Sequence, residues 1–343
     1  MRGERKRAGD THADSLLVTR IRLHLSSIHL LLHCPNMTAT DAVLSEGDAA
    51  HSAVTLALAQ KESLEHLIGM QDLYDMMRDR PLIVKAYAVD DPQAPSVSKS
   101  NVKVVHFVRH GQGFHNLMAD LAKAAGREWV PFTHTPENPY IMPELLDAPL
   151  TDKGRQQAQQ LQPIVRAWEN PPELVVFSPN CRALQTGLIV FQDWIPSSST
   201  TTTSTTSTTT NTKTPKVPFL AHEMVREENG VHSCDQRRTV SQQQMEFPQV
   251  DFGLLESDED PLFRKDVRES KLQVGERIYQ FMEWLADRSE THVAVNSHSG
   301  WLSTVFNGVC QCDDALKGWF QTGEMRSVKL EFVTNDNNSS EYD

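Results

Sequence analysis

The chain has 343 residues, of which 39 % are hydrophobic, enough for a sizeable buried core in one large domain or two ordinary ones. Its formal net charge of −12 repels the phosphates of nucleic acids and of anionic membranes, so we expect neither as a partner. A small phosphorylated substrate is compatible with this charge, because a few local arginines can hold one phosphate. The sequence leaves the oligomeric state open.

Residues 1–80 are predicted to form an N-terminal tail and a helix that docks on the main domain. The first 35 residues are basic and then rich in leucine, as in a targeting peptide, but three acidic residues among them favour a disordered or loosely helical tail. The apolar run there is interrupted by charge and is too short to cross a bilayer. From residue 54 to residue 77 the apolar residues recur at helical spacings, which predicts an amphipathic helix.

Short apolar runs in the rest of the chain predict buried strands whose tips lie in polar loops. They are Val102–Val108, Glu173–Phe177 and His292–Val295, with a closing strand at Val328–Val333. Helical patterns lie between them, at Asp152–Trp168, Cys181–Val190 and Asp266–Asp287. This alternation predicts an α/β fold, a three-layer sandwich in which helices flank a central, mostly parallel sheet.

The main domain is expected to span residues 81–335, followed by a disordered tail at 336–343. Residues 197–212 are almost entirely Ser and Thr and are too poor in apolar groups to offset their ordering entropy. We therefore predict a flexible surface insertion at 196–215. A glycosylated, mucin-like segment is the alternative, which the lack of a secretory signal disfavours.

The five cysteines are widely scattered and include no Cys-x-x-Cys pair, which is typical of a reducing compartment. We expect a cytoplasmic protein. Zinc is an alternative reading of His232-x-Cys234 and Cys310-x-Cys312, but neither spacing is usual for a chelating pair. No metal and no cofactor are therefore expected.

The tip of the first strand carries the strongest chemical signal, Arg109-His110-Gly111. A neutral imidazole is a good nucleophile toward phosphorus, and a neighbouring guanidinium neutralises a phosphate and holds it in line for attack. Glycines at positions 111 and 113 let the backbone come close to the phosphate oxygens. These residues predict a phosphate site in which His110 is the nucleophile.

The other tips add matching groups. Arg182 lies in the first turn of a predicted helix, where the dipole disfavours a cation unless an anion lies nearby; a solvated surface arginine is the alternative. At the third tip, His298 is a second imidazole that can stabilise the phosphoryl group as charge moves in the transition state. Thr151 precedes another predicted helix and is expected to be an N-cap that positions the helix and takes no part in the reaction.

Together these blocks resemble the histidine phosphatase superfamily over roughly residues 102–333. Within that superfamily, the stretches 226–238, 247–260 and 324–327 are similar to the phosphoglycerate mutase-like proteins of plants and fungi.

The resemblance implies a role for each matching residue. His110 corresponds to the phosphorylated histidine, Arg109 and Arg182 to the arginines that hold the phosphate, and His298 to the second core histidine. Asn116 is similar to a motif asparagine near the substrate. Ser299, beside His298, is a further expected substrate contact.

The family's general acid is a glutamate that follows the Arg182 segment, and Glu227, directly after Arg226, is the better match, with Glu228 as the alternative. A carboxylic acid whose pKa is raised in a closed pocket can protonate the departing alkoxide and then activate water. Where the common pattern is Arg-His-Gly-Glu, this chain has Gln112. The neutral amide is expected to alter local electrostatics without loss of catalysis.

Arg237 and Arg238 are candidates for binding a second anionic group of the substrate, although consecutive arginines are more often surface or salt-bridging residues. The leading hypothesis is a phosphatase that hydrolyses a phosphomonoester through a phosphohistidine. A mutase, which returns the phosphoryl group to another hydroxyl, is the close alternative. The third hypothesis is a catalytically silent regulatory or binding protein, which the presence of the four core residues disfavours.

Overall fold

A computed structural model of the chain describes residues 68–130, 133–195 and 217–335. Its strands are β1 (Leu82–Ala88), β2 (Val102–Arg109), β3 (Leu174–Phe177), β4 (Phe219–Ala221), β5 (His292–Ser297) and β6 (Met325–Thr334). Its α-helices are α3 (Met70–Met77), α4 (Phe114–Ala124), α5 (Asp152–Arg166), α6 (Cys181–Val190), α7 (Val240–Glu246), α8 (Lys271–Ala286) and α9 (Ser299–Thr304). The predicted N-terminal tail, the first part of the predicted docking helix, the Ser/Thr-rich insertion and the C-terminal tail lie outside the described residues.

The six strands form one sheet in the order β1-β6-β2-β5-β3-β4. β2, β5, β3 and β4 run parallel to one another, and β6 runs antiparallel to both β1 and β2. The prediction of a mostly parallel sheet is confirmed. β1 and β4 are not predicted from the sequence, because β4 is an apolar run of only three residues and Lys85 interrupts the apolar run of β1.

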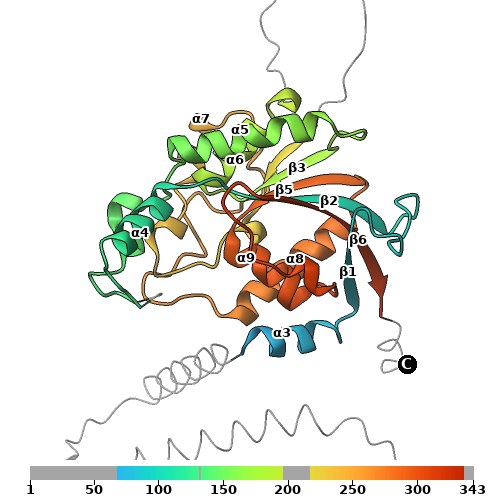
Figure 1. The fold of residues 1–343 in the computed structure, drawn as a ribbon, viewed down its shortest axis with the longest axis horizontal. Helices are drawn as coiled ribbons and strands as arrows, with labels where there is room; N and C mark the ends of the chain where they lie inside the picture. The colour runs from blue at the N-terminus through green and yellow to red at the C-terminus, as the bar shows by residue number, and fades with distance from the viewer. Residues whose placement is uncertain (1–67, 131–132, 196–216, 336–343) are drawn as a thin grey trace, which may run out of the picture. The chain divides into compact units, whose positions relative to one another are not determined.

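Helices cover both faces of this sheet, which confirms the three-layer α/β sandwich. In Figure 1, α5 and α6 lie on one side of the sheet, and α3, α8 and α9 lie on the other. Successive side chains of a strand point to opposite faces, so Phe107 packs with the α8 and α9 side while Val108 packs with the α5 and α6 side. Each central strand is therefore buried on both faces, which explains why its sequence is mostly apolar. The exceptions in β2 are Lys103 and His106, which are buried with hydrogen-bond partners.

Local capping residues set the ends of these helices. Thr151 is the N-cap of α5, as predicted, because its Oγ1 accepts a hydrogen bond from the Gly154 amide at 3.1 Å. α8 begins at Lys271, later than the predicted Asp266, because the Ser270 hydroxyl caps it by accepting from the Gln273 amide at 3.2 Å. Cap chemistry decides these boundaries more sharply than apolar periodicity does.

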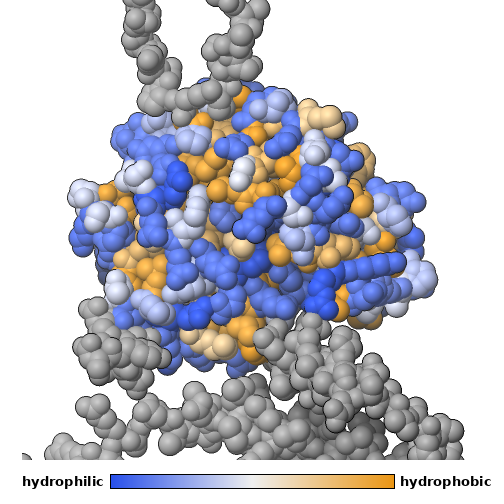
Figure 2. Space-filling model, turned by 180° about the vertical axis from the view of Figure 1, so that it is seen from behind, coloured by the Kyte–Doolittle hydropathy of each residue, from blue (hydrophilic) through white to orange (hydrophobic). Residues whose placement is uncertain are grey.

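The surface of the described residues is ordinary for a folded protein. Figure 2 shows hydrophilic and hydrophobic residues interspersed over the face opposite to that of Figure 1. The most exposed large apolar side chains, Met245, Val130 and Trp319, come from three separate segments. Isolated apolar side chains of this kind are normal on protein surfaces. Within the described ranges, no helix has the length and apolar character that a membrane span requires.

A close approach of two backbone segments positions the loop after β2. The first turn of α5 packs so tightly on this loop that a Cβ atom at Gly154 would collide with the backbone of Gln112, and one at Gly111 would collide with the backbone of Gly154. Both contacts are with backbone, which cannot move aside as a flexible side chain would. Glycine is therefore required at both positions.

We expect Gly154→Ala to lower the free energy of unfolding by about 1–3 kcal/mol, because the added methyl group forces the two segments apart. The measurement is urea-induced unfolding followed by circular dichroism. Gly318→Ala is the matched control, since a Cβ atom there comes no closer than 3.8 Å to any neighbour. Equal free energies of unfolding for the two variants would show that the contact between Gly154 and the loop after β2 can accommodate a methyl group.

Candidate active site

Four parallel strands bring four chemical groups to one edge of the sheet. His110 directly follows β2, His298 directly follows β5, Arg182 lies in the first turn of the helix after β3, and Glu227 follows β4 by six residues. These strands are neighbours in the sheet and point the same way, so their carboxyl ends meet at the same edge. Open α/β sheets bind ligands at this edge.

His110 is held in one tautomer. Its Nδ1 lies 2.7 Å from the carbonyl oxygen of Gly111, and because a carbonyl can only accept, Nδ1 carries the proton. Nε2 therefore keeps its lone pair, which accepts a hydrogen bond from Arg182 Nε at 3.3 Å. Burial, and then the charge of Arg182, hold the pKa of His110 well below its usual value. The ring is a neutral imidazole whose nucleophilic nitrogen faces the guanidinium.

Arg182 connects the two core histidines. The same Nε that faces His110 also donates to His298 Nδ1, at 3.2 Å. His298 Nδ1 is thus an acceptor, and its Nε2 donates to the Ser178 hydroxyl at 2.7 Å. The two imidazole rings lie 5.1 Å apart, centroid to centroid. Burial, and then Arg182, also hold the pKa of His298 well below its usual value.

A buried carboxylate fixes the other end of this guanidinium. Arg182 Nη2 lies 2.8 Å from Asp235 Oδ1, and Arg268 Nη1 lies 2.7 Å from Oδ2 of the same group. Burial by itself raises the pKa of Asp235, but Arg268, His232 and Arg182 outweigh it, and the pKa lies well below its usual value. The anion that the position of Arg182 predicted is thus supplied, in this structure, by the protein itself.

Arg109 differs from Arg182 in having no acidic partner. Its Nη1 donates to the carbonyl of Phe320 at 2.7 Å, and its guanidinium carbon lies 5.9 Å from the ring centroid of Trp319. Among the described residues, no carboxylate lies within 4.0 Å of its nitrogens, and its Nε has no hydrogen-bond partner. The side chain is 8 % exposed. A buried guanidinium of this kind is suited to an incoming anion.

The two glutamates that sequence reasoning left open have different surroundings. Glu227 accepts hydrogen bonds from the amides of Gly300 and Trp301, at 3.1 and 3.0 Å, next to His298. A Cβ atom at position 300 would collide with the Glu227 carboxylate, so glycine is needed for this approach. Glu228 instead pairs with Lys271 at 2.6 Å and with Arg268 at 3.6 Å. Of the two glutamates, Glu227 is therefore the one that is hydrogen-bonded to the segment directly after His298.

Two predicted substrate contacts have partners within the protein. The Asn116 side chain accepts from the Gly113 amide at 3.0 Å and closes the first turn of α4. Ser299 Oγ donates to Glu227 Oε2 at 3.3 Å, in the same cluster as the Gly300 amide. The structure therefore brings Ser299 to Glu227 and gives Asn116 a capping role in the loop that follows His110.

Arg237 and Arg238, the candidates for binding a second anion, both have ion-pair partners within the protein. The Arg237 side chain is 0 % exposed and donates to Glu223 at 2.8 Å and to backbone carbonyls of residues 238 and 257–259. Arg238 pairs with Asp147 at 3.2 Å and with Glu246 at 2.7 Å. Their charges and donors hold the loops around them together, so both have structural roles.

Sequence reasoning missed His115 and Asp235. His115 is 5 % exposed, and its ring centroid lies 5.5 Å from that of His110. Its position in the first helical turn after the Arg-His-Gly motif was the available signal. Asp235 lies among the arginines of segment 226–238, and only the tertiary contacts show that it pairs with Arg182.

Within the described ranges, no group of three or more His, Cys, Asp or Glu side chains is arranged to hold a metal ion. Burial, and then the neighbouring Asp235, raise the pKa of the Cys234 thiol well above its usual value. Burial, and then Cys312, do the same for Cys310. Protonated thiols are poor metal ligands.

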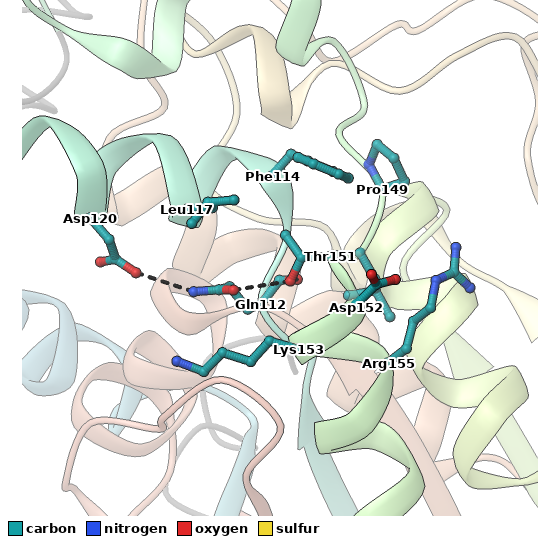
Figure 3. A pocket seen from close by; sticks show the side chains of 10 residues that line it. Gln112, Phe114, Leu117, Asp120, Pro149, Thr151, Asp152, Lys153 and Arg155 are labelled. Carbon is teal, nitrogen blue, oxygen red and sulfur yellow. Dashed lines mark hydrogen bonds between the residues drawn. The ribbon is translucent and has the colours of Figure 1, made fainter.

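A groove of about 770 Å³ lies beside the loop that carries His110. Figure 3 shows Gln112 between Asp120 and Thr151, and it bonds to their side chains at 3.2 and 3.0 Å. The neutral amide at position 112 thus donates to one side chain and accepts from the other. His110 is not among the residues that line this groove.

Comparisons with known proteins agree with this geometry. The chain is 34 % identical over 226 residues to a phosphoglycerate mutase-like protein of Arabidopsis thaliana, covering 63 % of this chain and 78 % of the relative. It is 32 % identical to phosphoglycerate mutase-like protein 1 of the same plant, covering 66 % and 81 %. A probable phosphatase of Schizosaccharomyces pombe is 28 % identical, covering 59 % and 76 %.

No family model matches the chain. Among solved structures, a phosphoglycerate mutase of Bacillus anthracis aligns over 70 % of this chain and 94 % of its own, at 15 % identity and a TM-score of 0.39, which is too low to support an argument. The plant relatives, which exceed 30 % identity and are covered over more than two thirds of their length, show the family. The chain belongs to the family of phosphoglycerate mutase-like proteins.

Proposed function

We propose that the protein is a phosphatase that hydrolyses a small phosphomonoester through a phosphohistidine on His110. The observation that carries the proposal is the tautomer of His110, in which Nδ1–H donates to the Gly111 carbonyl and the Nε2 lone pair faces Arg182. A neutral nitrogen beside a fixed guanidinium is the arrangement that in-line attack on phosphorus requires.

In the first step, the lone pair of His110 Nε2 forms a bond to phosphorus and the ester P–O bond breaks. The departing oxygen takes a proton from Glu227. Arg182 Nε, which bonds to the two imidazoles in the structure, shifts its donation to a phosphoryl oxygen, and Arg109 donates to another. The charge that moves onto the phosphoryl oxygens is thereby stabilised in a water-poor site.

In the second step, the Glu227 carboxylate takes a proton from water while the water oxygen attacks phosphorus. The P–N bond breaks, inorganic phosphate leaves, and His110 returns to its neutral form. Because Glu227 gives a proton in one step and takes one in the next, the cycle closes without a net change in the enzyme.

A mutase is the second candidate, supported by the burial of His110, which is 1 % exposed. A mutase must exclude water from the phosphohistidine long enough to return the phosphoryl group to a second hydroxyl. The two reactions share the first step and differ only in what accepts the phosphoryl group. Assays for isomerised product alongside free phosphate separate them.

We expect His110→Ala to abolish both phosphate release and an acid-labile phosphoryl-enzyme, because no other group supplies the attacking nitrogen. The measurement is incubation of the purified protein with a panel of phosphorylated metabolites, with assays for free phosphate and isomerised product. His106→Ala, which removes another buried histidine from the same strand, is the control. Equal phosphate release by the wild type and His110→Ala would end the nucleophile assignment.

Glu227→Gln and Glu228→Gln are expected to behave differently on substrates with poor leaving groups. Glu227→Gln should lower kcat about 100-fold or more, because the amide cannot donate the proton that the alkoxide needs. Glu228→Gln should change kcat little and should lower stability, because Lys271 loses its carboxylate partner while Arg268 keeps Asp235. Equal falls in kcat would contradict the assignment of Glu227 as the acid.

The depressed pKa of His110, caused by burial and by Arg182, predicts that its ring stays neutral as the pH falls below 6.5. The unfolded chain takes up a proton near this pH, so the stability that the buried ring contributes is present above it and is lost as the pH falls toward the folded pKa. Imidazole NMR signals, assigned by comparison with His110→Ala, should show no titration of His110 near pH 6.5. An ordinary titration curve there would contradict the burial argument.

A further inference from the structure

The cations around His110 are mostly neutralised by carboxylates of the protein. Arg182 and Arg268 share Asp235, at 2.8 and 2.7 Å, and Lys271 lies 2.6 Å from Glu228. These side chains form one connected network at the edge of the sheet. Its charge is set by ion pairs that exist before any substrate arrives.

Arginines farther along the same segments are also paired. Arg226 bonds to Asp260 at 2.7 Å, and Arg277 bonds to Glu269 at 2.7 Å. Together with the pairing of Arg237 and Arg238 described above, this leaves Arg109 as the arginine at His110 that has no carboxylate within 4.0 Å among the described residues.

The charge of the site matches one phosphate. Four cations, Arg109, Arg182, Arg268 and Lys271, face two carboxylates, Asp235 and Glu228, so two positive charges remain when Glu227 is protonated as the acid. A phosphate monoester dianion carries two negative charges. A carboxylate or second phosphate on the leaving group would be buried without a counter-ion, which is costly.

Aromatic rings also lie beside His110, next to the ion pairs. His115 lies 5.5 Å from His110, and Tyr140 lies 6.2 Å from His115, between ring centroids. Burial, and then Arg182, hold the pKa of His115 well below its usual value, and burial raises the pKa of Tyr140 to about 12. Both side chains are thus uncharged hydrogen-bonding groups at neutral pH.

His115 also has an unmet hydrogen bond. Its Nδ1 is buried and has no partner among the described residues. A buried polar atom without a hydrogen-bond partner lowers the stability of the protein. A ligand that supplies the missing hydrogen bond removes this unfavourable term when it binds. A hydroxyl group of a substrate is a suitable partner, because it can donate to or accept from a neutral imidazole.

We propose that the substrate is the phosphomonoester of an uncharged, hydroxyl-bearing alcohol, and that His115 and Tyr140 contact its leaving group. This inference rests on the proposed phosphatase function. The neighbouring groove adds no net charge, since the two cations that line it, Lys153 and Arg155, are equal in number to its two carboxylates, Asp120 and Asp152 (Figure 3). Once a phosphate dianion is bound, neither the named residues of the site nor those of the groove therefore carry a net positive charge that could attract a second anionic group of the substrate.

A matched pair of substrates tests this inference. Glycerol 3-phosphate and 3-phosphoglycerate have the same three-carbon skeleton and one phosphate, and differ in a hydroxymethyl group against a carboxylate. We expect kcat/KM for phosphate release to be at least about tenfold higher for glycerol 3-phosphate, since the carboxylate has no counter-ion in the site. Equal values, or a preference for 3-phosphoglycerate, would overturn the inference.

Two variants locate the contact. His115→Phe keeps a ring of similar size and removes both nitrogens, and Tyr140→Phe removes only the hydroxyl. Each should lower kcat/KM for glycerol 3-phosphate about tenfold and change that for p-nitrophenyl phosphate, whose leaving group has no hydroxyl to recognise, less than about threefold. Unchanged discrimination between these two substrates in both variants would contradict the assignment.

p-Nitrophenyl phosphate also separates this inference from the proposed function. If it is hydrolysed with dependence on His110 while 3-phosphoglycerate is preferred to glycerol 3-phosphate, the phosphatase proposal stands and the inference about the leaving group fails. If neither release of phosphate nor an acid-labile phosphoryl-enzyme is observed with any of the three esters, the proposed function fails, and the inference fails with it.

Discussion

The burial of one guanidinium group, that of Arg182, is the constraint on which the site depends. Its side chain is 1 % exposed, and a charge in such a place is tolerated only when it is paired and its donors are satisfied. Asp235 supplies the counter-charge, and the two core histidines accept from Nε. Burial, and then the charge of Arg182, hold the pKa of both imidazoles well below its usual value and so keep the rings neutral. The contacts that make the burial of Arg182 possible are therefore the ones that the proposed attack by His110 relies on.

The turn that carries Arg182 is itself fixed by a buried carboxylate. Asp147 accepts from the Cys181 amide at 2.8 Å and from the Gln243 side chain at 2.7 Å, and it also pairs with Arg238. Its φ angle of 46° lies in the left-handed region, which few residues other than glycine adopt. This network orients the first turn of α6 from outside the site, and it gives Arg238 its structural role.

His110 is 1 % exposed and His298 is 0 % exposed, so both side chains are closed off from solvent in this structure. Arg182 then occupies the lone pair that the proposed reaction needs, so substrate binding must replace an internal hydrogen bond with one to phosphate. This exchange costs little, because the donor is charged and the phosphate oxygen is a stronger acceptor than a neutral imidazole. The partner that changes is Nε, while Asp235 holds the rest of the guanidinium in place.

The sequence by itself determined the α/β alternation, the strand tips and the residues His110, Arg182 and His298, because apolar periodicity and the residues after each strand are local properties of the chain. The tertiary structure decided the partners. Asp235 is 53 residues from Arg182 in the chain, and Glu227 is 73 residues from the Gly300 amide that it binds. The structural role of Arg237 depends likewise on Glu223 and a distant loop. Local patterns show which groups reach a strand tip, but ion pairing is decided by segments that meet only after folding.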